Sequence, residues 1–233
     1  MPHSTFTSRF PTRIHRLDVG PRTIDLVAPV DPDALLDDGV IEDRYKVDNY
    51  LPYWPIIWPS GLMLAEKILT DGTAPPDCPP DVAGPPRAIE LGCGLGLAGI
   101  AAGLRGWHVT FTDYDPEAAE FAAHNAQRNG MAADRIRAMQ MDWRACIAET
   151  FPWVIASDVL YERRLHELVL VAIKTLLATG GVAWVSDPNR PSAEDFPIAA
   201  MDHGFRVSTV PMQGNNFAGE PQAGNLYVLS RAK

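Results

Sequence analysis

The sequence lacks the long apolar stretches that membrane-spanning and secreted proteins carry. No run approaches the about 20 consecutive apolar residues that a bilayer span requires. The first residues, Met1-Pro2-His3-Ser4, do not begin the apolar core of a secretory signal. We therefore expect a cytoplasmic protein that has no contact with a membrane.

Cysteines are few, and no metal-ligand spacing is present. The three cysteines, Cys78, Cys93 and Cys146, are far apart in the sequence and form no CxxC pair. An odd and scattered set of this kind disfavours both a disulfide framework and a zinc cluster. The six histidines are equally scattered, so we expect no metal site.

An excess of positive charge is missing as well. The chain has 20 Lys and Arg against 29 Asp and Glu, which gives a formal net charge of -9. Nucleic-acid binding depends on the neutralisation of phosphates, so this balance argues against a nucleic-acid partner. A negative surface suits a positively charged partner or substrate, or serves only solubility.

The apolar content is sufficient for one core. With 233 residues, of which 46% are hydrophobic, we expect a single domain over residues 1–233. Residues 1–86 would form an N-terminal extension, and residues 87–233 a cofactor-binding core. Alternating segments at Arg13–Val19 and Thr23–Val27 flank Gly20-Pro21 and predict a β-hairpin in the extension.

The rest of the extension is rich in proline and aromatic residues. Asp31–Asp38 is acidic and typical of a turn, and an aromatic segment with several prolines begins at Leu51. A helix is expected from Pro59 to about Thr70, because proline is tolerated in a first helical turn. Its buried face would consist of four residues at helical spacing: Leu62, Ala65, Ile68 and Leu69. The linker Asp71–Pro86 has six prolines and is expected to be neither helix nor strand.

From Arg87 onward, apolar segments of strand and helix length alternate. This alternation predicts an α/β protein with a doubly wound, mostly parallel, Rossmann-like sheet of seven strands. The expected strands cover residues 88–91, 108–113, 135–141, 153–158 and 182–187, and two more near 205–212 and 225–230 would close the sheet edge. The expected helices cover residues 97–104, 116–129 and 162–178.

A glycine-rich turn follows the strand at 88–91. Gly92, Gly94 and Gly96 would let the backbone turn sharply and approach a nucleotide, and the next helix begins directly after them. Gly94-x-Gly96-x-x-Gly99 also matches the dinucleotide fingerprint, which is a weak signal alone.

Glu90 distinguishes between the two cofactor classes. A carboxylate at the end of this strand would repel a pyrophosphate, whereas it would attract the ammonium and sulfonium groups of S-adenosylmethionine. We therefore favour S-adenosylmethionine as the cofactor and keep a nicotinamide-dinucleotide oxidoreductase as the remote alternative. A plain solvated strand end is the other interpretation of Glu90.

The ends of the second and third strands carry further polar and aromatic residues. Asp113 lies about 20 positions after the glycine turn, as recognition of a ribose requires. Tyr114 would lie along the adenine or be a surface aromatic, while Asp115 precedes Pro116 and is expected to cap the next helix. Asp142-Trp143 would bind the adenine amino group and ring, or else cap a helix and fill the core.

The fourth strand ends in Asp158-Val-Leu-Tyr161, at the sheet edge where parallel sheets bind ligands. Asp158 could orient an incoming amine beside Tyr161, or it could cap a helix that begins at Glu162. Tyr53, Trp54, Trp58 and Tyr161 would form an aromatic rim suited to an alkylammonium group. Alternatively, Trp54 and Trp58 pack the N-terminal helix onto the sheet.

Taken together, these motifs resemble those of seven-β-strand methyltransferases. With Trp58-Pro59-Ser60-Gly61 upstream, the stretch from about Tyr53 to Asp187 is similar to the family-16 branch, which includes many protein-lysine methyltransferases. The resemblance implies S-adenosylmethionine bound by the glycine loop, Asp113 and Asp142-Trp143, with Trp58 at its methionine end. It also implies that Asp158 and Tyr161 line the acceptor lysine site. We expect methylation of a protein lysine, with a small nicotinamide-like amine as the alternative acceptor.

Overall fold

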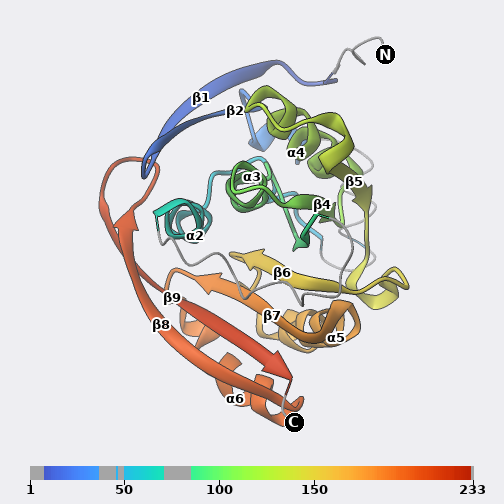
Figure 1. Ribbon diagram of the computed structural model, residues 1–233. Coiled ribbons are helices and arrows are strands. Elements are labelled where there is room, and N and C mark those ends of the chain that lie inside the picture. Colours follow the sequence, from blue (N-terminus) through green and yellow to red (C-terminus); the bar gives the residue numbers. More distant parts are fainter. Residues whose placement is uncertain (1–7, 37–45, 47–49, 71–84, 232–233) are drawn as a thin grey trace.

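The computed structural model describes residues 8–36, 46, 50–70 and 85–231. Its main feature is a seven-stranded sheet in the order β5-β4-β3-β6-β7-β9-β8 (Figure 1). The strands are β3 (Arg87–Leu91), β4 (His108–Asp113), β5 (Ile136–Gln140), β6 (Phe151–Ser157), β7 (Leu177–Asp187), β8 (Phe205–Asn215) and β9 (Pro221–Arg231). The first five are parallel, and β9 runs antiparallel to both β7 and β8. The predicted mostly parallel α/β sheet is confirmed.

Helices cover both faces of this sheet (Figure 1). On one face lie α2 (Pro59–Thr70), α3 (Leu97–Leu104) and α4 (Pro116–Arg128), and on the other lie α5 (His166–Leu176) and α6 (Phe196–Asp202). Successive side chains of a strand point to opposite faces. Ala88 accordingly packs into the core beside α2, α3 and α4, and Ile89 into the core beside α5 and α6.

The starts of two helices follow from local chemistry. Gly96, with φ of 85°, directly precedes α3. Asp115 precedes α4, and its side chain accepts a hydrogen bond from the backbone N–H of Glu117, while Pro116 occupies the first turn. Such a residue pair satisfies one free N–H and removes another. The predicted cap at Asp115 is therefore confirmed.

The N-terminal hairpin forms a sheet of its own. Strands β1 (Thr12–Val19) and β2 (Arg22–Pro29) pair antiparallel, as the sequence predicts. The hairpin lies over α4, and β2 is the nearer strand (Figure 1). Ile24 and Leu26 are buried in the same core as α2, α3 and α4. The hairpin therefore extends the helical layer and is not an edge strand of the main sheet.

Several boundaries differ from the prediction. Helix α5 is shorter than 162–178, because a 3₁₀ turn (Arg163–Leu165) precedes it and β7 begins at its end. Strands β8 and β9 are each 11 residues long, since they pair with each other along their whole length. Helix α6 was not predicted.

Parts of the extension bear on further expectations. In α2, Ala65, Ile68 and Leu69 are buried as expected, whereas Leu62 is only half-buried. The acidic turn contains a 3₁₀ helix at Asp33–Leu35. The expectations for Met1–Ser4, for Cys78, for positions 37 and 38 of the acidic turn, and for most of the linker 71–86 lie outside the described residues.

Candidate active site

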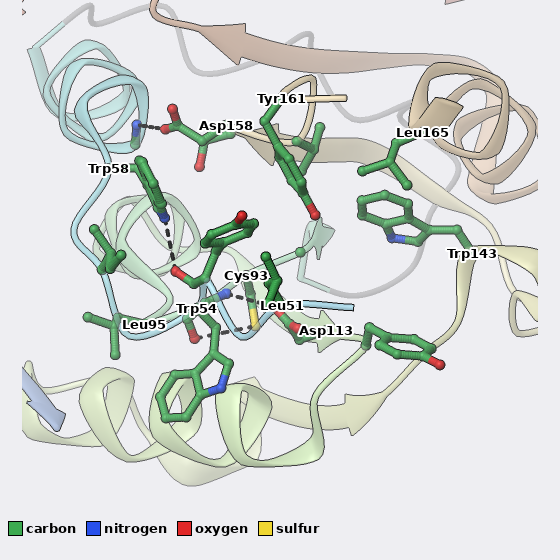
Figure 2. Close-up of a pocket in the computed structure, with 18 of the residues that line it drawn as sticks. Leu51, Trp54, Trp58, Cys93, Leu95, Asp113, Trp143, Asp158, Tyr161 and Leu165 are labelled. Carbon is green, nitrogen blue, oxygen red and sulfur yellow. Dashed lines mark hydrogen bonds between the residues drawn. The ribbon is translucent and has the colours of Figure 1, made fainter. Parts of the chain in front are cut away.

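A cavity lies at the carboxyl ends of β3, β4 and β6, beside the segment 50–58 that leads into α2 (Figure 2). The chain proceeds from β3 to β4 and β5 on one side, and then crosses to β6 on the other side of β3. Such a reversal of strand order opens a crevice in which α/β proteins bind their ligands. The cavity volume is about 220 Å³, so a small organic ligand rather than a single water fits inside.

The glycine turn forms the floor of the cavity. Gly92, Gly94 and Gly96 all have positive φ, of 62°, 50° and 85°. Gly92 and Gly94 line the cavity, whereas Gly96 packs below it, where an added Cβ would lie 2.8 Å from the Cβ of Ala122. At Gly94 a Cβ would lie 3.1 Å from the carbonyl oxygen of Trp54. Positions 94 and 96 therefore require glycine, because the backbone has a positive φ and because neighbouring atoms leave no room for a Cβ.

Asp113 joins the end of β4 to this turn. Its Oδ2 accepts a hydrogen bond from the backbone N–H of Gly94 (3.0 Å), and its Oδ1 accepts one from the N–H of Asp115 (3.0 Å). The residue is nearly buried but lines the cavity. Burial raises the pKa of Asp113 to about 6, although the backbone hydrogen bonds oppose this rise. A charged acceptor thus lies at the cavity wall at neutral pH.

Glu90 does not line the cavity. Its side chain extends from β3 toward α3, where Oε2 accepts a hydrogen bond from the backbone N–H of Gly99 (3.1 Å). A Cβ at position 99 would lie 2.4 Å from this oxygen, so the close approach of the helix requires glycine. Burial, and secondarily the charge of Asp113, raise the pKa of Glu90 to about 8. The expected position of Glu90 inside the cofactor cleft is not what the structure shows.

Tyr114, Asp142 and Trp143 line the side of the cavity between β4 and α5. The Tyr114 ring lies 5.1 Å from the ring of Tyr50, measured between centroids. Asp142 caps the 3₁₀ turn at Trp143–Ala145, and its hydrogen bond with Arg144 lowers the pKa of Asp142. Asp142 therefore caps a turn, as one interpretation predicts, and it also lines the cavity, while its contact with an adenine stays a prediction.

Trp143 is half-buried and lies against the core beside α5. Its indole also lies next to Leu165 at the cavity wall (Figure 2). Trp143 therefore packs against the core and also lines the cavity.

Asp158 occupies a strained position at the end of β6, with φ of 59°. Its Oδ2 accepts hydrogen bonds from the Ser60 hydroxyl (2.7 Å) and the Gly61 N–H (2.9 Å) at the start of α2. Its Oδ1 forms an ion pair with Arg190 (2.8 Å). Burial raises the pKa of Asp158, and Arg190 and Ser60 oppose this effect. Asp158 thus caps α2 and does not cap a helix at Glu162.

Three of the four predicted rim aromatics meet. The Tyr53 ring lies edge-on between Trp58 and Tyr161, at centroid distances of 6.0 and 5.5 Å. The Trp58 indole N–H donates to the Tyr53 carbonyl oxygen (3.0 Å), and Tyr161 projects into the cavity (Figure 2). Burial raises the pKa of Tyr161 to about 12, so its hydroxyl stays protonated at neutral pH. Trp54 is buried against Phe121 of α4 (5.0 Å) and also lines the cavity, so it packs in the core, but against α4 and not between the N-terminal helix and the sheet.

Sequence reasoning missed other residues of the site. Leu165 and Leu168 fall within the helix expected over 162–178, yet they are half-buried and line the cavity, together with Leu26 of the hairpin. Arg190 pairs with Asp158 and Asp187 (2.9 Å), and its guanidinium lies 5.5 Å from the centre of the Trp58 ring. An apolar pattern cannot distinguish core from cavity wall, and no sequence motif marks Arg190.

Among residues 8–36, 46, 50–70 and 85–231, no three His, Cys, Asp or Glu side chains are grouped so as to hold a metal ion. Within the same ranges, no helix is long and apolar enough to cross a membrane.

Comparisons with known proteins agree on one family. The family model described as lysine methyltransferase matches residues 55–202. The electron transfer flavoprotein beta subunit lysine methyltransferase of Xenopus laevis is 30% identical over 63% of this chain and 56% of that protein. The calmodulin-lysine N-methyltransferase of Arabidopsis thaliana is 31% identical over 65% of this chain and 49% of that protein. The chain thus spans about half the length of these relatives.

Among solved structures, the chain resembles a TehB-like SAM-dependent methyltransferase from Corynebacterium glutamicum. The TM-score is 0.53 at 18% identity, over 86% of this chain and 100% of that one. At this identity the likeness establishes the fold alone.

Proposed function

Because the chain belongs to the lysine methyltransferase family, we propose that it transfers a methyl group from S-adenosylmethionine to the amine of a lysine in another protein. The observation that carries this proposal is the composition of the cavity. The glycine turn, Asp113 and Trp143 line it together with three aromatic rings, those of Tyr53, Trp58 and Tyr161. A nucleoside site and an alkylamine site therefore share one cavity.

The cofactor half of the proposal assigns a task to each lining residue. Asp113 would accept hydrogen bonds from the ribose hydroxyls, since a carboxylate forms strong, charge-assisted bonds. Gly92 and Gly94 leave room for the cofactor to approach the backbone. Tyr114, Asp142 and Trp143 are assigned to the adenine ring and its amino group. When bound, the sulfonium supplies a methyl carbon already activated for in-line displacement.

The role of Glu90 changes in this assignment. Since its carboxyl lies beneath the glycine turn, we propose that it supports the site by holding α3 against β3. Direct attraction to the ammonium or sulfonium of the cofactor is not part of this role.

The acceptor half rests on Tyr53, Trp58 and Tyr161. A lysine must be neutral to attack the methyl carbon, and burial among aromatic rings lowers the pKa of an amine. The negative faces of the same rings attract an alkylammonium, which opposes this lowering of the pKa but helps to hold the charged, methylated product. Alignment and partial desolvation are then the main contributions of the enzyme.

Asp158 is proposed to orient the acceptor site through its contacts with α2 and Arg190. Both of its carboxylate oxygens are engaged, one by the start of α2 and the other by Arg190. Its cap fixes the helix that Trp58 precedes, so Asp158 acts as a positioning residue for the aromatic rim. A role as general base is not assigned to it.

A transfer assay with labelled S-adenosylmethionine tests this proposal. The protein is incubated with lysate proteins in one arm and with a mixture of amine metabolites, including nicotinamide, in the other. We expect label in protein that acid hydrolysis releases as methyllysine. Label found in metabolites alone would instead identify a small-molecule N-methyltransferase. Mass spectrometry of a deletion strain against its parent would then name the acceptor.

Glu66→Gln is the control for substitutions of cavity residues in this assay. Glu66 is an exposed residue of α2 that does not line the cavity, so full activity is expected.

The cytoplasmic location stays a prediction, and electron transfer flavoprotein and calmodulin remain acceptors of the relatives only.

A further inference from the structure

Asn125 of α4 and Asn129, which directly follows that helix, pair with the backbone of β2 in the hairpin. Asn125 accepts a hydrogen bond from the Val27 N–H (2.8 Å) and donates to the Val27 carbonyl oxygen (3.1 Å). Asn129 does the same with Asp25, at 2.9 and 2.8 Å. The two side-chain amides thus pair with the strand edge much as a neighbouring strand would.

The spacing of the two elements explains why this pairing is possible. Four residues advance a helix by about 6 Å, and two residues advance a strand by about 6.6 Å. Asn125 and Asn129 therefore stay in register with Val27 and Asp25. The N–H and C=O groups of Asp25 and Val27 are satisfied in this way, which an exposed strand edge requires. This arrangement alone would explain both asparagines as hairpin contacts.

Asn125 makes one more contact, and that contact reaches the glycine turn. Its Nδ2 also donates to the carbonyl oxygen of Leu95 (3.1 Å), a cavity-lining residue between Gly94 and Gly96. Asn125 is completely buried, and this bond uses the second of its two amide donors. One side chain therefore bonds to the hairpin and to the cofactor turn at once.

We propose that Asn125 is a positioning residue that makes the N-terminal hairpin part of the cofactor site. The inference rests on the proposed function, since it assumes that the glycine turn holds S-adenosylmethionine. Leu26 of β2, which lies between the two paired residues, lines the same cavity. Docking of the hairpin fixes the Asn125 amide, and the amide fixes the carbonyl of Leu95. The hairpin then raises the affinity for the cofactor as well as covering α4.

Asn129, at the C-terminal end of the same helix, provides a matched control. It makes the same two bonds to β2, and its other bond goes to the Asn125 carbonyl oxygen and not to the turn. If the asparagines only dock the hairpin, Asn125→Ala and Asn129→Ala have similar effects on cofactor binding. If Asn125 positions the turn, only its substitution has a large effect.

Calorimetric titration with S-adenosylhomocysteine separates these cases. We expect Asn125→Ala to weaken binding about tenfold, which is the size of one or two lost buried hydrogen bonds, and Asn129→Ala to weaken it less than about threefold. Equal affinities for both variants and the wild type would overturn the inference and leave the proposed function intact. Failure of the wild type to bind would overturn both.

A measurement on the wild-type protein covers the case in which Asn125→Ala does not fold. Coupling between two sites is reciprocal, so a hairpin that strengthens cofactor binding is itself stabilised by the cofactor. Saturating S-adenosylhomocysteine should slow hydrogen exchange at the Asp25 and Val27 amides about tenfold. Protection confined to residues 92–97, with unchanged exchange in β2, would contradict the coupling.

Discussion

Replacing Glu90 with glutamine converts a buried carboxyl group into a neutral amide of nearly the same size. Glutamine keeps an oxygen that can accept the Gly99 N–H, so the contact between β3 and α3 is retained. The pKa of Glu90 is raised from 4.5 to about 8, chiefly because the side chain is buried. In the folded protein this group therefore keeps its proton at neutral pH, whereas in the unfolded chain it loses it.

The sign of the effect follows from this difference in bound protons. The folded state holds one more proton than the unfolded state between the two pKa values, so stability falls as pH rises through that window. The stabilising contribution is complete below the unfolded pKa and is lost by about pH 8. At about 1.4 kcal/mol per pH unit, the loss is of the order of 4 kcal/mol between about pH 5 and pH 8.

Urea unfolding of the ligand-free protein, followed by tryptophan fluorescence, measures this change. We expect Glu90→Gln to gain stability over the wild type as pH rises, with little difference at about pH 5. Glu66→Gln, on the exposed face of α2, serves as the control and should follow the wild-type curve. Parallel curves for Glu90→Gln and the wild type across this range would show that Glu90 is ionised in the folded state, and the burial argument would be wrong.

Three other substitutions test separate parts of the site. Asp113→Asn should weaken binding of S-adenosylhomocysteine about tenfold or more, which is the size of a lost charge-assisted bond. The affinity of the wild type should rise from about pH 5 to 7, because Asp113 ionises near its pKa of about 6. A calorimetric affinity that changes neither with the substitution nor with pH would contradict the ribose role of Asp113. Gly94→Ala should lower stability by about 1–3 kcal/mol in urea unfolding, because φ is 50° and the new Cβ meets the carbonyl oxygen of Trp54; unchanged unfolding would disprove this strain. Arg190→Met should lower stability by roughly 3 kcal/mol, because it leaves Asp158 and Asp187 buried without their cation; a neutral effect would show that the carboxylates tolerate its loss.

The sequence predicted the elements whose ends carry strong local signals. Helix α3 and strand β4 have the predicted bounds, because the glycine turn precedes one and Asp115-Pro116 follows the other. Where such signals are weak, the pairing between strands determines where an element begins or ends. Strand β7 begins earlier than predicted because Leu177 pairs with Phe151.

The candidate site was predictable as a set of strand ends but not in the direction of each side chain. Glu90 follows the alternation of β3 and faces α3, although its place in the motif suggests the cleft. Asp158 adopts a left-handed conformation that turns its carboxylate toward α2 and Arg190. Arg190 lies 32 positions after Asp158, and such a contact depends on the tertiary fold, so no local pattern reveals it.

The cavity beside the glycine turn is proposed to hold the sulfonium donor of a methyl group. Calorimetric titration of the wild-type protein with S-adenosylmethionine, S-adenosylhomocysteine and NADH tests it most directly. We predict one binding site per chain for the first two compounds and no binding of NADH. Saturable binding of NADH without binding of either sulfur nucleoside would contradict the account.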